Sequence, residues 1–231
     1  MLDNAGRELR AFLLPRRCRL CLAPLPPEAM ALCAGCRQAL PWIIHACPTC
    51  ALPRPDDSPC PACVRHPPPQ DAAWAIFKLE APIHKAILKL KYGAGFGEAR
   101  WLGEALADAF TQHSHPHPDC LLPVPLHASR LRKRGYNQVL EVARVAGRAL
   151  HIPVDPGALT RIRATADQIG QSRGERRRNL HGAFSASPTL NGLHIAILDD
   201  VMTTGSTLAE VARACRAAGA RRVEVWALAR A

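Results

Sequence analysis

Four Cys-x-x-Cys pairs hold eight of the ten cysteines in this chain, and they constrain its fold more than any other feature. Two thiolates at this spacing can bind one metal ion from a tight turn, and two such pairs complete the four-sulfur shell of a structural zinc site. The eight sulfurs therefore predict two zinc ions. The predicted ligands are Cys18, Cys21, Cys33, Cys36, Cys47, Cys50, Cys60 and Cys63.

The spacing between the pairs leaves their grouping open. Eleven, ten and nine residues separate successive pairs, so sequential pairs or alternate pairs could share an ion, and we favour sequential pairs. A segment of some sixty residues with few large apolar groups needs such metal links to fold. A saturated sulfur shell leaves no open position for a substrate, so both ions are expected to be structural. Cys120 and Cys215 stand alone and are expected in the core.

The run His-Pro-Pro-Pro-Gln at 66–70 predicts a domain boundary, because it is too rich in proline to continue a helix or a central strand. We expect a small cysteine-rich domain over 1–70 and a second domain over 71–231. Hydrophobic residues at 48% and charged residues at 21% are typical of soluble globular proteins. The apolar stretch near the N-terminus is broken by Arg10 and ended by Pro15, which predicts a cytoplasmic chain without membrane insertion.

Beyond residue 70, apolar segments with strand character alternate with segments whose apolar residues recur at helical spacing. This alternation predicts an α/β fold, a parallel sheet flanked by helices. Two helices are expected after the first strand, one from Pro82 and one that carries Leu102, Leu106 and Phe110. The other expected elements are strands at 73–79, 120–126, 195–198 and 223–228 and helices at 137–150 and 207–218.

Two acids and a loop of small residues follow the expected strand at 195–198. Backbone N–H groups of such a loop and of the next helix form an anion pocket, and the loop hydroxyls add donors. The adjacent carboxylates can accept hydrogen bonds from the vicinal hydroxyls of a sugar. The segment therefore predicts a sugar-phosphate site, and it lacks the glycine patterns of the common nucleotide-binding loops.

This segment closely resembles the loop of type I phosphoribosyltransferases that binds phosphoribosyl pyrophosphate (PRPP). In those proteins an apolar strand, two acids and a Thr-x-Gly-x-Thr-like loop occur in the same order. The resemblance implies that PRPP, with Mg²⁺, is the sugar phosphate bound here. The implied ligand-binding residues are Asp199, Asp200, Thr203, Thr204, Gly205, Ser206 and Thr207.

Basic residues are concentrated between 121 and 183, where twelve Lys or Arg face four acids. A basic turn between a strand and a helix offers Arg130, Arg132, Lys133 and Arg134 to a pyrophosphate group, with Gly135 allowing close approach. A second stretch around Arg176 is expected to form a mobile flap over PRPP or to contact a nucleic-acid backbone. Aromatic residues are few, which argues against a base-stacking platform.

The segments 124–138 and 168–184, with the cysteine pairs and the loop, resemble the ComF/GntX-like family over nearly the whole chain. In that family a double zinc ribbon precedes a domain of type I phosphoribosyltransferase-like fold. The resemblance implies a role in natural competence and in handling incoming single-stranded DNA, with competence proteins as partners.

The biochemical function stays open between two main alternatives. In the first, the chain is a phosphoribosyltransferase that transfers or releases a phosphoribosyl group with loss of pyrophosphate. In the second, it is a non-catalytic DNA-handling module that uses PRPP or a nucleotide as an allosteric ligand. A PRPP-responsive regulator is a third alternative, because fold alone does not determine function.

Overall fold

The structure is a computed structural model that describes residues 16–26, 31–93, 95–112, 116–163 and 180–231. The chain packs into two compact units, Met1–Pro41 and Trp42–Ala231. The second half of the cysteine-rich segment therefore packs within the larger unit. The boundary expected at residue 70 between the zinc ribbons and the second domain stays a prediction.

The smaller unit carries the first two cysteine pairs on short loops. Helix α2 (Ala34–Gln38) begins after Cys33, whose sulfur accepts a hydrogen bond from the backbone N–H of Cys36. An isolated antiparallel bridge between Arg17 and Pro24 closes the loop around Cys18 and Cys21. The described residues of this unit contain little secondary structure, so we expect metal binding by its cysteines to stabilise the fold.

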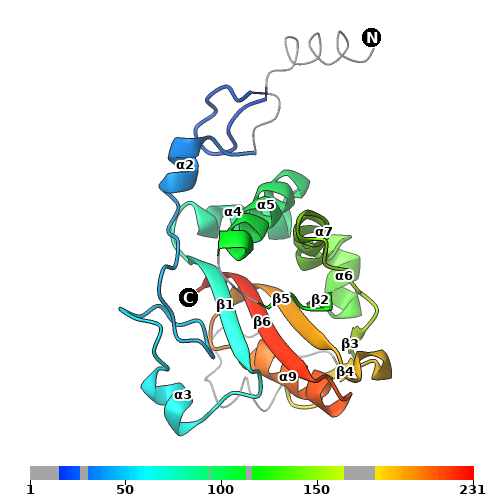
Figure 1. The fold of residues 1–231 in the computed structure, drawn as a ribbon. Helices are drawn as coiled ribbons and strands as arrows, with labels where there is room; N and C mark the ends of the chain where they lie inside the picture. Colours follow the sequence, from blue (N-terminus) through cyan, green and yellow to red (C-terminus); the bar gives the residue numbers. More distant parts are fainter. Residues whose placement is uncertain (1–15, 27–30, 94, 113–115, 164–179) are drawn as a thin grey trace. The chain divides into compact units, whose positions relative to one another are not determined.

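The larger unit is built on a four-stranded parallel sheet in the order β1-β6-β5-β2, which confirms the expected architecture (Figure 1). Strand β2 is shorter than expected, and β5 is longer because it pairs with β6 as far as Met202 and Arg230. Asp199 and Asp200 therefore lie within β5 and not after it. The strands are β1 (Ala72–Lys78), β2 (Cys120–Pro123), β5 (His194–Met202) and β6 (Arg222–Arg230).

Helices cover both faces of this sheet (Figure 1). On one face lie α4 (Ile83–Tyr92), α5 (Phe96–Gln112) and α7 (Gln138–Leu150), and on the other lies α9 (Ser206–Ala217). Helices α5 and α7 pack closely, because a Cβ atom on Gly103 would lie 2.6 Å from the Cβ of Val145. The helices expected from apolar spacing are thereby confirmed.

Two features differ from the sequence prediction. Helix α6 (Ala128–Arg134) occupies the expected basic turn, capped by His127, whose ring accepts a hydrogen bond from the N–H of Ser129. Gly135 ends α6 in the left-handed conformation at φ 83°, which glycine adopts without strain. A short antiparallel pair, β3 (Leu159–Arg161) and β4 (Phe184–Ala186), was also not expected.

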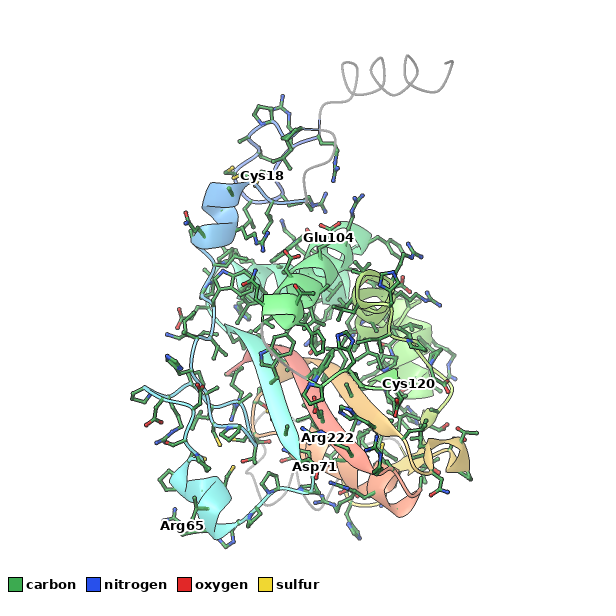
Figure 2. The ribbon with its side chains drawn as sticks, viewed as in Figure 1. Cys18, Arg65, Asp71, Glu104, Cys120 and Arg222 are labelled. Carbon is green, nitrogen blue, oxygen red and sulfur yellow. The ribbon has the colours of Figure 1, made fainter. Side chains whose placement is uncertain are left out.

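Apolar side chains between the sheet and its helices form the core. Cys120, at the start of β2 (Figure 2), and Cys215 on α9 are buried there, as expected.

Gly219 follows α9 at φ 90° and allows the chain to turn into β6. The remaining short elements are α3 (Pro61–Arg65) and the 3₁₀ helix Pro188–Leu190. None of the helices in the described segments combines the length and the hydropathy that a bilayer crossing requires.

Candidate functional site

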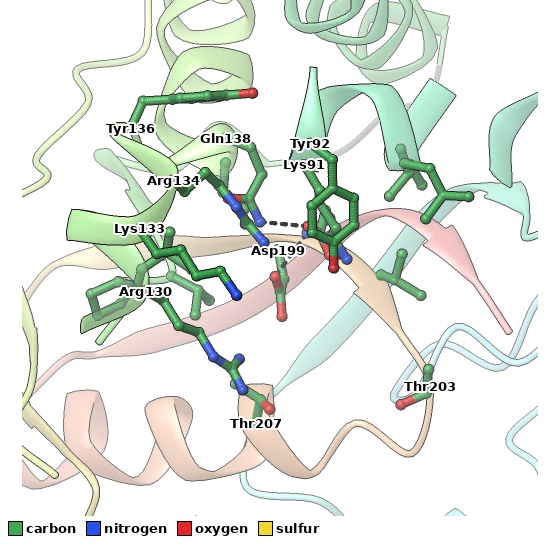
Figure 3. A pocket seen from close by; sticks show the side chains of 18 of the residues that line it. Lys91, Tyr92, Arg130, Lys133, Arg134, Tyr136, Gln138, Asp199, Thr203 and Thr207 are labelled. Carbon is green, nitrogen blue, oxygen red and sulfur yellow. Dashed lines mark hydrogen bonds and ion pairs between the residues drawn. The ribbon is translucent and has the colours of Figure 1, made fainter. Parts of the chain in front are cut away.

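A pocket of about 800 Å³ lies around the carboxyl end of β5 (Figure 3). Ligands of parallel α/β sheets bind at this end of the strands, and the volume suits a small organic ligand. Residues of α4, of the β2–α6 connection, of α6 and α7, and of the loop before α9 line it. Its ionisable lining residues are His84, Lys91, Arg130, Lys133, Arg134, Arg161, Asp199 and Asp200.

Asp200 is fixed by partners on both sides. Its carboxylate accepts a hydrogen bond from Gln138 Nε2 at 2.7 Å and lies 3.1 Å from Lys91 Nζ. Gln138 in turn accepts a hydrogen bond from Arg134, so the chain of contacts runs from α6 through α7 to β5. With only 5% of its surface exposed, Asp200 is held as a paired, buried carboxylate.

Asp199, like Asp200, lines the pocket (Figure 3). Its Oδ1 accepts a hydrogen bond from the N–H of Asp200 at 2.8 Å. Burial, together with the neighbouring Asp200 carboxylate, raises the pKa of Asp199 to about 7. The two acids therefore differ: Asp200 is bound within the protein, whereas Asp199 titrates near neutral pH.

The loop between β5 and α9 contributes hydroxyl groups and a helix N-terminus. Gly205 adopts φ 73°, and the hydroxyls of Thr204 and Ser206 lie 2.8 Å apart. Thr203 and Thr207 line the pocket, whereas Thr204, Gly205 and Ser206 are not among its lining residues. The N–H of Ser206 donates a hydrogen bond to Thr204 Oγ1 at 3.4 Å, and the dipole of α9 favours an anion at its N-terminus.

Helix α6 directs three cations into the pocket (Figure 3). Arg130, Lys133 and Arg134 line it, and their spacing of three and four residues places them on one helical face. Arg132 and Gly135 are exposed and are not among the lining residues. The candidate Arg176 lies outside the described residues.

Lys91, Gln138 and Arg161 are pocket residues that the sequence analysis did not identify as functional. Burial, with the nearby positive charge of Arg130, lowers the pKa of the Arg161 guanidinium. The sequence did contain an indication for Lys91. It lies four residues after Ile87 and eight after Ile83, on the helical face that those residues pack against the core. For Arg161 the sequence carried no comparable signal.

Aromatic rings gather beside the pocket, although aromatic residues are few in the sequence. Tyr92 is 80% exposed and Phe96 is 60% exposed. The Phe96 ring stacks on Tyr136, with centroids 5.7 Å apart and an interplanar angle of 29°. The Arg134 guanidinium lies 5.5 Å from the centroid of the Tyr92 ring. We call Tyr92, Phe96, Tyr136 and Arg134 the aromatic rim.

The cysteine pairs form two tetrads in sequential order, as favoured above. They are Cys18, Cys21, Cys33 and Cys36, and Cys47, Cys50, Cys60 and Cys63, with all sulfurs of a tetrad within 4.8 Å. The Cys21–Cys33 and Cys50–Cys60 sulfurs are both 3.7 Å apart. Zn–S bonds of about 2.3 Å in a tetrahedron place the sulfurs about 3.8 Å apart, so both tetrads fit zinc.

Comparison with known proteins agrees with both parts of this architecture. Residues 9–64 match the model of a double zinc ribbon domain, and residues 107–231 match that of a phosphoribosyl transferase domain. The DNA utilization protein YhgH of Salmonella typhi is 35% identical over 222 residues, which cover 94% of this chain and 98% of that protein. Competence protein F of Haemophilus influenzae is 32% identical and covers 93% and 97%, respectively.

Among solved structures, an allosteric regulatory enzyme of purine biosynthesis matches 61% of this chain and 29% of its own chain. Its identity is 20% and its TM-score is 0.38, which is too low to carry a conclusion. The family is shown by the two family models and by the relatives that match nearly the whole chain. The chain therefore belongs to the ComF/GntX-like family, in which a double zinc ribbon precedes a phosphoribosyltransferase domain.

Proposed function

We propose that this chain binds PRPP with Mg²⁺ in the pocket at the end of β5. We further propose that it transfers or releases the phosphoribosyl group, with loss of pyrophosphate, during DNA uptake. One observation carries the proposal: Thr203 and Thr207 of the loop 203–207, which we call the phosphate loop, line the same pocket as Asp199 and three cations of α6. This combination offers an anion site, a sugar site and a second anion site together.

Each part of PRPP has complementary partners in this arrangement. The 5-phosphate suits the loop 203–207 and the N-terminus of α9. The ribose hydroxyls suit the carboxylate of Asp199, which acts as an acceptor when ionised. The pyrophosphate suits the guanidinium and ammonium groups of Arg130, Lys133 and Arg161.

The proposed reaction breaks the bond between the anomeric carbon and the pyrophosphate oxygen, and pyrophosphate leaves with the electron pair. A nitrogen nucleophile or water forms the new bond to the anomeric carbon and releases a proton. Mg²⁺ arrives with PRPP and offsets part of its negative charge. The residues of the chain hold the ribose and stabilise the negative charge that develops on the leaving group.

Isothermal titration of Mg²⁺-PRPP into the zinc-loaded protein tests this proposal. We expect saturable binding by the wild type and at least tenfold weaker binding by Asp199→Asn, measured at about pH 8, where the wild-type carboxylate is ionised. Asp155→Asn, on the connection after α7, is the matched control. Pyrophosphate release is then assayed with nitrogen nucleophiles and with water. A folded wild type that binds no PRPP would contradict the proposal.

The aromatic rim favours a second candidate, a DNA-handling module that uses PRPP as an allosteric ligand. Exposed rings beside cations are the features by which proteins stack and hold single-stranded nucleic acid. The relatives named DNA utilization protein and competence protein F agree with such a role. This candidate predicts salt-dependent binding of single-stranded DNA without pyrophosphate release. A cytoplasmic location and binding to competence proteins stay predictions.

A further inference from the structure

In the turn 48–50 of the second cysteine tetrad, three successive backbone carbonyls accept hydrogen bonds, two of them from residues of the sheet. Pro48 O accepts a hydrogen bond from Ala73 N at 2.7 Å, and Thr49 O accepts one from Gln70 Nε2 at 2.7 Å. Cys50 O accepts one from Arg230 Nε at 3.0 Å. All of these residues belong to the larger compact unit.

Arg230 connects this turn to the phosphate loop. The side chain lies at the end of β6 and is 7% exposed. Its Nη1 donates a hydrogen bond to Met202 O at 3.0 Å and another to Thr203 O. Met202 ends β5, and Thr203 begins the loop and lines the pocket. One guanidinium therefore holds the carbonyl of a zinc ligand and two carbonyls at the start of the loop.

The planar guanidinium suits this task because its donors have fixed directions. Nε and Nη1 donate hydrogen bonds to carbonyls of two different segments. A shift of one segment therefore affects the position of the other. If Cys50 moved, the Arg230 side chain would lose this hydrogen bond, and breaking a hydrogen bond to a buried charged group is costly. Metal binding fixes Cys50 by linking its sulfur to Cys47, Cys60 and Cys63.

We propose that Arg230 is a positioning residue that makes the second zinc centre part of the PRPP site. The inference rests on the proposed function, because it takes PRPP as the ligand of the loop. Zinc at the Cys47 tetrad holds the loop in its binding conformation, and PRPP on the loop stabilises the tetrad. Such coupling is reciprocal, so each ligand increases the affinity for the other.

The first tetrad provides a control within the same molecule. It has the same four-sulfur composition and lies in the smaller compact unit, whereas Arg230 bonds to the second tetrad. Removal of zinc by PRPP or by released pyrophosphate through direct chelation would affect both tetrads. Protection of the Cys47 tetrad alone would therefore report the proposed connection.

The test follows zinc loss and cysteine alkylation with and without saturating Mg²⁺-PRPP. Zinc release to a chelating dye is recorded while iodoacetamide labels the freed cysteines, which mass spectrometry then assigns to each tetrad. We expect PRPP to slow labelling of Cys47, Cys50, Cys60 and Cys63 at least fivefold and to leave the Cys18 tetrad unchanged. Equal labelling rates with and without bound PRPP at the Cys47 tetrad would overturn the inference.

Arg230→Met supplies the second comparison, since methionine fills part of the space without hydrogen-bond donors. We expect this variant to keep two zinc ions, to bind PRPP at least tenfold more weakly and to lose the protection when saturated. Full protection in a folded Arg230→Met protein would overturn the role of Arg230. If the variant does not fold, the wild-type labelling decides alone.

Calorimetry on the same samples separates the two possible failures. If wild-type protein binds no PRPP, the proposed function fails and the inference falls with it. If PRPP binds and the Cys47 tetrad gains no protection, the proposed function stands and the coupling is wrong.

Discussion

The ammonium group of Lys91 on α4 lies 3.1 Å from the carboxylate of Asp200 on β5. Gln138 on α7 donates to the other carboxylate oxygen, so two helices meet the same acid. This relationship fixes the carboxylate of Asp200 between two helices. Under the proposed function, Asp199 is then the acid of this adjacent pair that holds the ribose.

Replacement of Lys91 by methionine should destabilise the protein by about 2 kcal/mol, because it leaves a buried carboxylate without its cation. Chemical denaturation measures the loss. Lys89→Met, on an exposed part of the same helix, is the control and should change stability by less than about 0.5 kcal/mol.

A double variant, Lys91→Met with Asp200→Asn, should be more stable than Lys91→Met alone, because it also removes the unpaired charge. Gln138 can still donate to the amide oxygen of asparagine. If the two single effects simply add, the ion pair makes no measurable contribution to stability.

PRPP affinity should fall as the pH is lowered through about 7, the pKa to which burial and Asp200 raise Asp199. Only the ionised carboxylate accepts hydrogen bonds from both ribose hydroxyls. We expect about tenfold weaker binding per pH unit in the acidic range, measured by calorimetry. Asp199→Asn should retain only the titration of the ligand phosphates, whose second pKa is about 6. Parallel pH profiles in wild type and variant would refute this assignment.

The same pKa shift affects stability with a defined sign. The folded state holds the Asp199 proton more tightly than the unfolded state, in which the pKa is near 3.8. Ionisation therefore destabilises the fold as the pH rises from about 4 to about 7. The melting temperature of Asp199→Asn relative to wild type should rise over this range.

The strand, loop and helix of the candidate phosphate site could be located from sequence because they are contiguous: a buried strand, two acids and a run of small residues precede α9. The zinc centres could be predicted because each pair lies within one tight turn. Even there, the extent of β5 was underestimated. Pairing with β6 as far as Met202 places Asp199 within the strand, and that pairing depends on tertiary structure.

The rest of the site could not be predicted, because it joins segments that are distant in sequence. Lys91 and Gln138 meet Asp200 only after α4 and α7 have packed on the sheet. Helix α6 has only two apolar residues, Ala128 and Leu131, in seven, so no apolar period distinguishes it from a turn. Arg161 lies on a three-residue strand, too short to leave a pattern.

The helical structure of α6 predicts which of its cations bind PRPP. Arg130→Ala and Lys133→Ala should each weaken binding about tenfold, or about 1.4 kcal/mol, because both side chains line the pocket. Arg132→Ala removes the same charge from the exposed side and should change affinity less than about twofold. Titrations at one ionic strength compare the three variants. Equal losses would indicate a general field effect and not contact with the ligand.

The aromatic rim predicts a stacking contribution to single-stranded DNA binding. Tyr92→Ala or Phe96→Ala should weaken binding of a labelled oligonucleotide by about 1–3 kcal/mol, because each removes an exposed ring. Fluorescence anisotropy over a series of salt concentrations measures it. Leu131→Ala, an exposed apolar residue outside the rim, is the control.

Salt dependence separates stacking from charge at this rim. Loss of a ring should lower affinity without changing the slope of log K against log salt, since no phosphate contact is removed. Lys133→Ala should instead reduce that slope by about 0.7 if its ammonium contacts a phosphate of the strand. If the ring variants bind DNA as tightly as wild type, the strand does not stack on the rim. The DNA-handling candidate would then depend on the zinc ribbons or on basic residues elsewhere in the chain.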